Sequence, residues 1–194
     1  MDAAVRCVRR HGFEKTSIAD IAAEAGVTRP TVYLYFKSRE TVLGAAMLHA
    51  ARDLAARLVR HVRRFDDPHE QVVENLLFCL REFGRYPSLA LVMEERSFDL
   101  GARSSLSPQG LEIARRGLEP LLERRPELAG QADELAEVMV RFFLSLLTID
   151  GPRRRSDAEM RRFLHRRLVP ALGLDAPVRR RTRPGGQAGR RASA

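Results

Sequence analysis

A glycine at position 26 separates two short amphipathic segments, and this arrangement constrains the fold more than any other feature. Residues 17–25 carry apolar side chains at positions 18, 21, 22 and 25, which is the spacing of one helix face. Gly26 interrupts the period, and a second segment opens at Thr28 with Val32 and Phe36 on its inner side. Two short helices joined at a glycine are typical of the helix-turn-helix, whose second helix enters the DNA major groove.

The residues at the expected helix ends are of types that commonly cap or terminate helices. Ser17 followed by Asp20 predicts a capping box, and Gly26 suits the left-handed turn that ends the first helix. Thr28 is a good N-cap, and Pro30 falls in the first turn, where its missing N–H does no harm. The second helix is about two turns long. Because so short a helix is unstable alone, its neighbours must hold it.

Helical spacing dominates the whole chain, so the sequence predicts an all-α protein of about nine helices. We expect three domains: a helix-turn-helix head over residues 1–44, a helical effector-binding and dimerisation body over 45–174, and a disordered tail over 175–194. Residues 101–107 (GARSSLS) are expected to form a polar loop. The expected helices span 2–11, 17–25, 28–35, 40–64, 69–85, 88–98, 108–123, 127–150 and 156–172. Ser156 with Glu159 predicts a second capping box at the start of the last helix. The helix 40–64 carries an apolar stripe of Leu43, Met47, Ala50, Leu54 and Leu58.

The charge is concentrated in the tail. Of the net +9 of the chain, residues 175–194 supply +5, from six Arg and one Asp, which leaves +4 for the rest. Its Arg, Pro, Gly and Ser content predicts disorder. The tail either adds a sequence-independent attraction to DNA or keeps the protein in solution.

Several function classes lack support in the sequence. Cys7 and Cys79 stand 72 positions apart and form no metal-binding pair, and the five histidines show no ligand spacing. We therefore expect no metal, no cofactor and no catalytic residue, and a reducing cytoplasmic location. The most apolar stretch, residues 138–149, is too short to span a bilayer and contains Arg141.

The N-terminal motifs resemble the tetracycline-repressor (TetR) family of bacterial transcriptional regulators. Arg39 stands where that family commonly has Lys, and members usually carry about ten further residues before the point where this chain starts. Either the true start lies upstream or an N-terminal arm is lacking. The matching positions are Gly12-Phe13, Thr16-Ser17-Ile18, Ile21-Ala22, Ala25-Gly26-Val27, Thr31-Val32-Tyr33, Tyr35-Phe36 and Ser38-Arg39-Glu40 with Leu43.

The resemblance implies which residues of the head contact DNA. Arg29, Thr31 and Tyr33 would face the major groove, with Pro30 and Leu34 available for apolar contact. Arg29 would contact a guanine edge or only a phosphate, and Tyr33 would contact a base or pack as a core ring. The implied phosphate contacts are Ser17, Thr28, Tyr35 and Lys37. For Ser17 and Thr28 the alternative is capping alone. Residues assigned to the core are Phe13, Ile18, Ile21, Val27, Val32 and Phe36.

The resemblance also implies a homodimer through the last two helices and a small molecule bound in the body. The apolar stripe from Leu135 to Leu147 and the helix 156–172 are the candidates for the dimer face. Aromatic and aliphatic residues favour an apolar or amphipathic ligand, although ordinary helix packing is the alternative for each of them. Candidate ligand-binding residues are Phe78, Phe83, Tyr86, Met93, Phe98 and Phe142.

The sequence thus predicts a DNA-binding transcriptional regulator, a repressor that a ligand releases from a palindromic double-stranded operator. The rival hypothesis is a sequence-tolerant DNA-coating protein without an effector. A catalytic helical protein has little support, because no nucleophile motif or Gly-rich phosphate loop is present.

Overall fold

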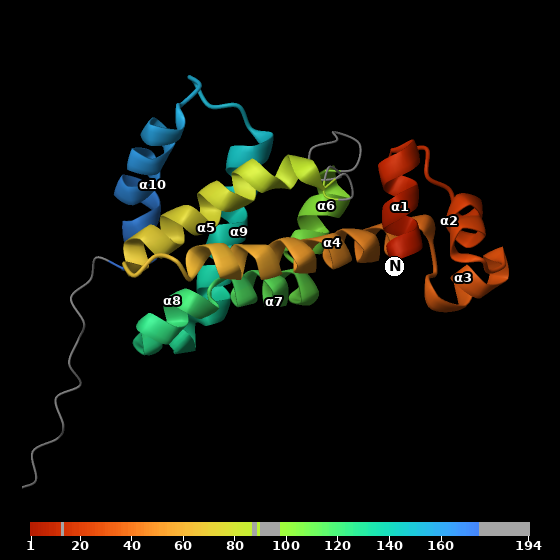
Figure 1. The fold of residues 1–194 in the computed structure, drawn as a ribbon, viewed down its shortest axis with the longest axis horizontal. Helices are drawn as coiled ribbons and strands as arrows, with labels where there is room; N and C mark the ends of the chain where they lie inside the picture. The colour runs from red at the N-terminus through yellow and green to blue at the C-terminus, as the bar shows by residue number, and fades with distance from the viewer. Residues whose placement is uncertain (13, 87–88, 90–97, 175–194) are drawn as a thin grey trace, which may run out of the picture.

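The structure, a computed structural model, describes residues 1–12, 14–86, 89 and 98–174. Over this part the chain forms ten α-helices and two 3₁₀ helices and no strand, which confirms the predicted all-α class (Figure 1). None of the described helices is long and apolar enough to cross a membrane. The elements are α1 Asp2–His11, α2 Ile18–Ala25, α3 Arg29–Tyr35, α4 Arg39–Val62, α5 Pro68–Glu82, η1 Phe83–Arg85, α6 Phe98–Ser105, α7 Pro108–Gly117, α8 Glu119–Arg124, η3 Pro126–Gln131, α9 Ala132–Thr148 and α10 Asp157–Ala171.

Helices α1, α2 and α3 gather at one end of the molecule and form the head (Figure 1). Ala4 and Val8 of α1 pack with Ile21 of α2 and Val32 of α3 in one buried cluster. Val32 is the one buried residue of α3. This seven-residue helix is therefore held by a single inward side chain and by its caps, as its length requires.

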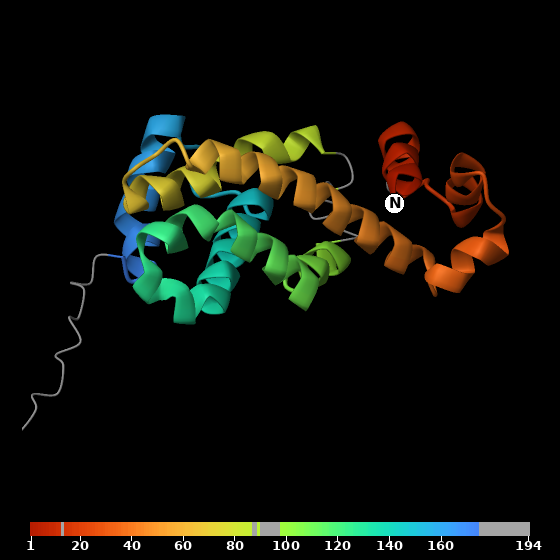
Figure 2. The same cartoon turned by 60° about the horizontal axis from the view of Figure 1, so that its bottom comes forward.

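Helix α4 joins the head to the body (Figure 2). Its 24 residues begin after Ser38, whose hydroxyl accepts from the Thr41 backbone N–H while Thr41 returns the bond. At 1.5 Å per residue the helix is about 36 Å long. The predicted stripe of Leu43, Met47, Ala50, Leu54 and Leu58 is buried. Its N-terminal half packs on the head and its C-terminal half on the body, so one rigid element spans both.

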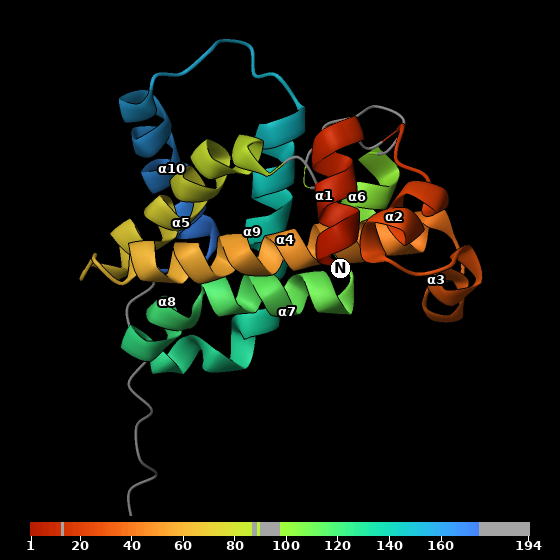
Figure 3. The same cartoon turned by 45° about the vertical axis from the view of Figure 1, so that its right-hand side comes forward.

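In the body, α5 and α7 pack on α4, α9 packs on α5 and α7, and α10 packs on α5 (Figure 3). A second buried cluster joins Leu76 of α5 and Leu121 of α8 to Leu164 and Leu168 of α10. Helix α10 opens with the predicted capping box: Ser156 accepts from the Glu159 N–H, and the Glu159 carboxylate accepts from the Ser156 N–H at 3.0 Å. These hydrogen bonds hold the pKa of Glu159 down at about 2.

The structure corrects the predicted loop at 101–107. Residues 98–105 form α6, in which the Arg103 guanidinium pairs with Asp99 one turn before it. Leu100 and Ala102 pack against the core cluster that begins in the head. The Gly and Ser content suggested a loop, but tertiary packing outweighs these low helix propensities.

Two predicted long helices are each divided in the structure. The expected helix 108–123 becomes α7 and α8, with the break at Leu118, because Pro120 cannot donate the hydrogen bond that continuity needs. The expected helix 127–150 begins as η3 and becomes α-helical only at Ala132. The expected helix 88–98 lies, apart from Leu89 and Phe98, outside the described residues.

Candidate nucleic-acid interface

The turn between α2 and α3 has the backbone geometry that the sequence predicts. Gly26 adopts φ 66° and ψ 29°, the left-handed conformation, and the Val27 N–H donates back to the Ala22 carbonyl at 2.9 Å. At the other end of α2, the Ser17 N–H and hydroxyl both donate to the Asp20 carboxylate, at 2.9 and 2.6 Å. These bonds lower the pKa of Asp20. The predicted capping box is therefore present, and α2 holds α3 at a fixed angle.

Helix α3 turns its long side chains outward. Tyr33, Leu34 and Tyr35 are 52%, 83% and 78% exposed, and Arg29 and Pro30 are exposed beside them. Large apolar side chains exposed together on a surface mark a contact site for another molecule. The assignment of Val27 to the core is wrong: its side chain is 41% exposed, because the turn carries it to the edge of the head.

Two of the residues predicted to contact phosphate, Ser17 and Thr28, serve as helix caps. Ser17 Oγ accepts from the Asp20 N–H at 3.2 Å, and Thr28 Oγ1 accepts from the Thr31 N–H at 3.4 Å. Thr28 and Thr31 also share a hydroxyl–hydroxyl bond of 2.9 Å. Thr31 is half-buried, whereas Lys37, just past the end of α3, is exposed. Capping and contact with a phosphate are compatible, because a helix N-terminus offers its free N–H groups to an anion.

The charge around α3 suits an anionic partner. From Val27 to Lys37 the chain has two basic residues and no acidic one. The nearby carboxylate of Glu24, on α2, is paired with Arg6 at 2.6 Å and Arg10 at 3.1 Å. The hydrogen bond from Arg6 lowers the pKa of Glu24. The α1 arginines thus neutralise the last acidic residue before α3.

A second feature of the head is the role of Arg39, which the sequence did not indicate. Its guanidinium donates to the backbone carbonyls of Thr16 at 2.8 Å and Glu14 at 3.0 Å. The first residue of α4 is thereby tied to the segment that precedes α2. Arg39 therefore positions the helix-turn-helix against α4.

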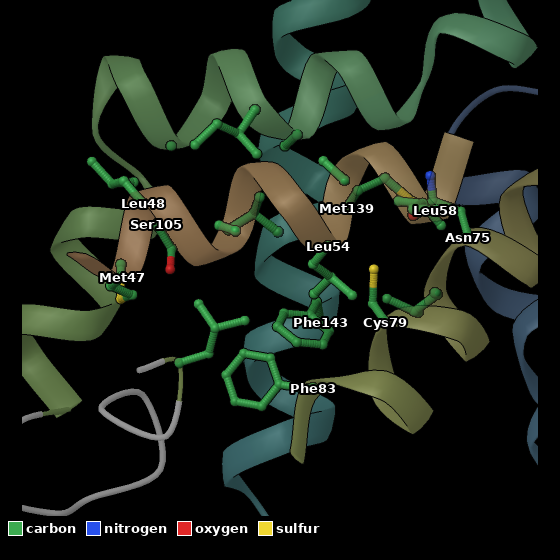
Figure 4. Close-up of a pocket in the computed structure, with 18 of the residues that line it drawn as sticks. Met47, Leu48, Leu54, Leu58, Asn75, Cys79, Phe83, Ser105, Met139 and Phe143 are labelled. Atoms are coloured by element: carbon green, nitrogen blue, oxygen red, sulfur yellow. The ribbon is translucent and has the colours of Figure 1, made fainter. Parts of the chain in front are cut away.

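The body contains an apolar cavity of about 140 Å³ beside α4 (Figure 4). Among the described residues, its lining includes the predicted Phe83 but not Phe78, Tyr86 or Phe142. Met93 lies outside the described residues, as does the side chain of Phe98. The lining residues are Met47, Leu48, Ala51, Leu54, Ala55, Leu58, Asn75, Leu76, Cys79, Phe83, Leu89, Ser105, Gly110, Ile113, Ala114, Leu118, Met139, Val140 and Phe143.

The polar groups at the cavity are committed to the fold. Asn75 Nδ2 donates to the Gly117 carbonyl at 2.9 Å, and Ser105 Oγ donates to the Gly101 carbonyl at 2.9 Å. Burial raises the pKa of the Cys79 thiol to about 12, so the thiol is neutral and a poor nucleophile. No Asp, Glu, Lys or Arg occurs among the described lining residues. The cavity therefore suits an apolar group.

The rings of Phe78 and Tyr86, both predicted to bind ligand, have other contacts. Phe78 stacks on His61, with ring centroids 4.7 Å apart. Tyr86 Oη donates to Asp53 Oδ2 at 2.7 Å and accepts from Arg57 Nη1 at 2.9 Å. Aromatic type alone did not distinguish such residues from those that line the cavity.

A buried ionic network in the body was also not predicted. Glu74 of α5 is 3% exposed at its side chain and pairs with His61 of α4 at 2.7 Å, with Arg81 at 3.1 Å and with Arg161 of α10. Arg161 also pairs with Glu70 at 2.6 Å. The one sequence signal for this network was that Glu74 lies among the buried apolar residues of α5. No group of His, Cys, Asp or Glu in the described residues could hold a metal ion.

A helical head with a glycine turn and an outward, acid-free second helix defines a helix-turn-helix protein. Residues 1–46 match the family model for bacterial regulatory proteins of the tetR family. The chain is 32% identical to the HTH-type transcriptional regulator BetI of Brucella canis over 72 residues, 37% of this chain and 36% of that protein. It is 42% identical to the fatty acid metabolism regulator protein of Bacillus subtilis over 43 residues, 22% of each chain. The matched N-terminal residues are therefore similar to regulators of the tetR family.

The fold over most of the chain is similar to that of a solved structure. The TetR-family repressor AlkX from Dietzia, implicated in biodegradation of n-alkanes, superposes with a TM-score of 0.66. Identity to AlkX is 22%, and the match covers 89% of this chain and 95% of AlkX. The likeness concerns the fold. In sequence, the chain spans about a third of the length of the curated BetI relatives that it matches.

Proposed function

We propose that the protein is a DNA-binding transcriptional repressor that a small apolar or amphipathic molecule releases from its operator. The observation that carries this proposal is the outward face of α3, where Arg29, Tyr33 and Tyr35 are exposed on a helix fixed by its caps. Arg29 and Tyr33 contact base edges, with Thr31 and Pro30 beside them. Tyr35, Lys37 and the helix N-termini at Ser17 and Thr28 hold phosphates.

Two copies of the chain act together through α9 and α10. These helices leave Phe142, Leu146, Met160 and Phe163 only half-buried, and Ile149 is 67% exposed. Self-association of such faces about a two-fold axis covers them and presents two α3 helices to one DNA duplex. The operator is then a palindrome, available in the bacterial cytoplasm, whose half-sites are spaced by whole helical turns.

The cavity supplies the regulatory site. It lies between the middle of α4, residues 47–58, and helices α5, α7 and α9, while the N-terminal end of α4 carries the head. A ligand that binds one tilt of α4 better than another changes the spacing of the two α3 helices. The shift is limited by the difference between its affinities for the two states. Residues 1–44 thus serve DNA binding and residues 45–174 serve ligand binding and dimerisation.

The experiment that tests this proposal measures sequence preference. DNA fragments bound by the protein in cells are mapped, and the affinity for the recovered operator is compared with that for a scrambled duplex at physiological salt. A specific regulator binds its operator about 10³-fold or more tightly than other DNA. A ratio near one would instead favour a sequence-tolerant DNA-coating protein. The same operator then serves to screen apolar and amphipathic molecules for release.

A further inference from the structure

A polar cluster on the outer side of α4 ties this helix to the segment that follows α5. We define the Tyr86 cluster as Asp53, Arg57, Glu82 and Tyr86. Asp53 and Arg57 lie one turn apart on α4, and both contact the Tyr86 hydroxyl, at 2.7 and 2.9 Å. The second Nη of Arg57 donates to the Glu82 carboxylate. Three contacts, two to the Tyr86 phenol and one to Glu82, therefore bridge α4 to the end of α5 and η1.

The residues next to this cluster line the cavity. Leu54 and Leu58 follow Asp53 and Arg57 directly on α4, and both face the cavity. On the other side of the bridge, Phe83 lies between Glu82 and Tyr86, is 4% exposed and also lines the cavity. Figure 4 shows Leu54, Phe83 and Phe143 converging on this space. The cluster thus connects α4 to η1, and both of these elements also line the cavity.

Occupation of the cavity acts on both sides of this bridge. The ring of Phe83 packs edge-on against Phe143, with centroids 5.2 Å apart, so η1 is backed by α9. A ligand that displaces Phe83 moves η1, and packed elements shift as units rather than deform continuously. With the bridge closed, the displacement reaches α4 through Asp53 and Arg57. When the contacts of the cluster are removed, η1 moves and α4 stays in place.

We infer that the Tyr86 cluster couples the cavity to the long helix that carries the head, so that it converts ligand binding into a change in DNA affinity. This inference rests on the proposed function and adds to it the positioning residues that carry the signal. Burial and the hydrogen bond to Asp53 raise the pKa of Tyr86, so the phenol keeps the proton that it donates at physiological pH.

The test uses benzene as the probe, because apolar protein cavities of about 150 Å³ take up benzene. Operator affinity of the full chain is measured with and without saturating benzene, and benzene affinity is measured separately. The variants are the double substitution Tyr86→Phe with Glu82→Ala and the double substitution Asp53→Ala with Arg57→Met, each of which removes all three contacts of the bridge from one side. Asp99→Asn breaks an exposed ion pair within α6 and serves as the matched control.

In the wild type and in Asp99→Asn, benzene is expected to weaken operator binding about tenfold, within the usual range of coupling between two sites. In the two bridge variants, benzene binds as before and operator affinity without benzene is unchanged. Benzene then changes operator affinity less than about twofold. If benzene weakens operator binding equally in wild type and both variants, the coupling role is wrong and the proposed function stands. If benzene leaves wild-type operator binding unchanged, the ligand-release part of the proposed function fails, and this inference fails with it.

Discussion

The guanidinium of Arg39 donates to the backbone carbonyl of Thr16 at 2.8 Å, across 23 residues of chain. Thr16 is itself buried, and its hydroxyl donates to the Gly12 carbonyl at 2.7 Å. The segment between α1 and α2 is thereby fixed from both sides. This contact sets the orientation of α2, and through the Gly26 turn that of α3.

The first prediction concerns Arg39→Gln. This variant loses a charged group that bonds two backbone carbonyls, and charge-assisted hydrogen bonds contribute about 1.5–3 kcal/mol. We expect the free energy of unfolding, measured by urea denaturation, to fall by about 2 kcal/mol. Operator affinity should fall as well, because α2 and α3 lose a fixed position. Unchanged stability would show that the two carbonyls are satisfied equally well by water.

A second prediction distinguishes a phosphate contact by Lys37 from a base contact by Arg29. Lys37→Ala should lower the affinities for the operator and for scrambled DNA by the same factor. It should also reduce the slope of log K against log salt concentration by about one. Arg29→Ala should cost about 1–3 kcal/mol on the operator and little on scrambled DNA. Arg124→Ala, in α8 at the far end of the body, is the control and should change neither. Equal losses on both DNAs for Arg29→Ala would make Arg29 a phosphate ligand.

The third prediction concerns the buried Glu74. Burial raises the pKa of this carboxyl, but bonds from His61 and Arg161 outweigh burial, so the folded pKa lies below the usual value. A lowered folded pKa stabilises the protein above the unfolded pKa of about 4.3, and this stabilisation disappears as the pH falls through the folded value. Glu74→Gln should lower the free energy of unfolding at pH 6 by about 3 kcal/mol.

Denaturant titrations of wild type and Glu74→Gln between pH 6 and pH 3 check this prediction. The difference in unfolding free energy should shrink toward the acid end. The control is Glu137→Gln, which breaks an exposed pair with Arg141 and should change stability by less than about 1 kcal/mol at any pH. A difference for Glu74→Gln that stays constant with pH would contradict the assigned ionic role.

The fourth prediction concerns the turn glycine. Gly26→Ala places a Cβ in the left-handed region, which disfavours L-residues by about 1–2 kcal/mol, although no atom blocks the new methyl group. Gly130→Ala, where there is also space and φ is not positive, is the matched control. Thermal melting should show that Gly26→Ala is less stable than Gly130→Ala, by that amount of unfolding free energy. Equal stability would mean that the turn relaxes without strain.

The sequence predicted those features that depend on neighbours along the chain. The capping boxes at Ser17 and Ser156 and the left-handed Gly26 are local and were correctly expected. The stripe on α4 follows from helical period alone and is buried as predicted. In α3, Val32 is buried and Thr31 is half-buried, and the remaining side chains of this short helix are exposed.

What the sequence missed depends on pairs distant in the chain. The bond between Glu74 and Arg161 spans 87 residues, and that between Arg57 and Tyr86 spans 29. No periodicity identifies such partners. The same reason explains why Tyr86 was expected among ligand-binding residues, whereas its hydroxyl bridges α4 and η1. In α6, the tertiary contacts of Leu100 stabilise a helix, although the composition of this segment favoured a loop.

The central claim is that α3 presents Arg29, Thr31 and Tyr33 to the bases. The most direct test replaces all three by alanine and measures the affinity for the operator and for scrambled DNA, together with thermal melting. The account predicts a folded protein whose operator affinity falls to the level of scrambled DNA, a loss of about 10³-fold or more. Operator affinity equal to that of the wild type in the folded triple variant would contradict it.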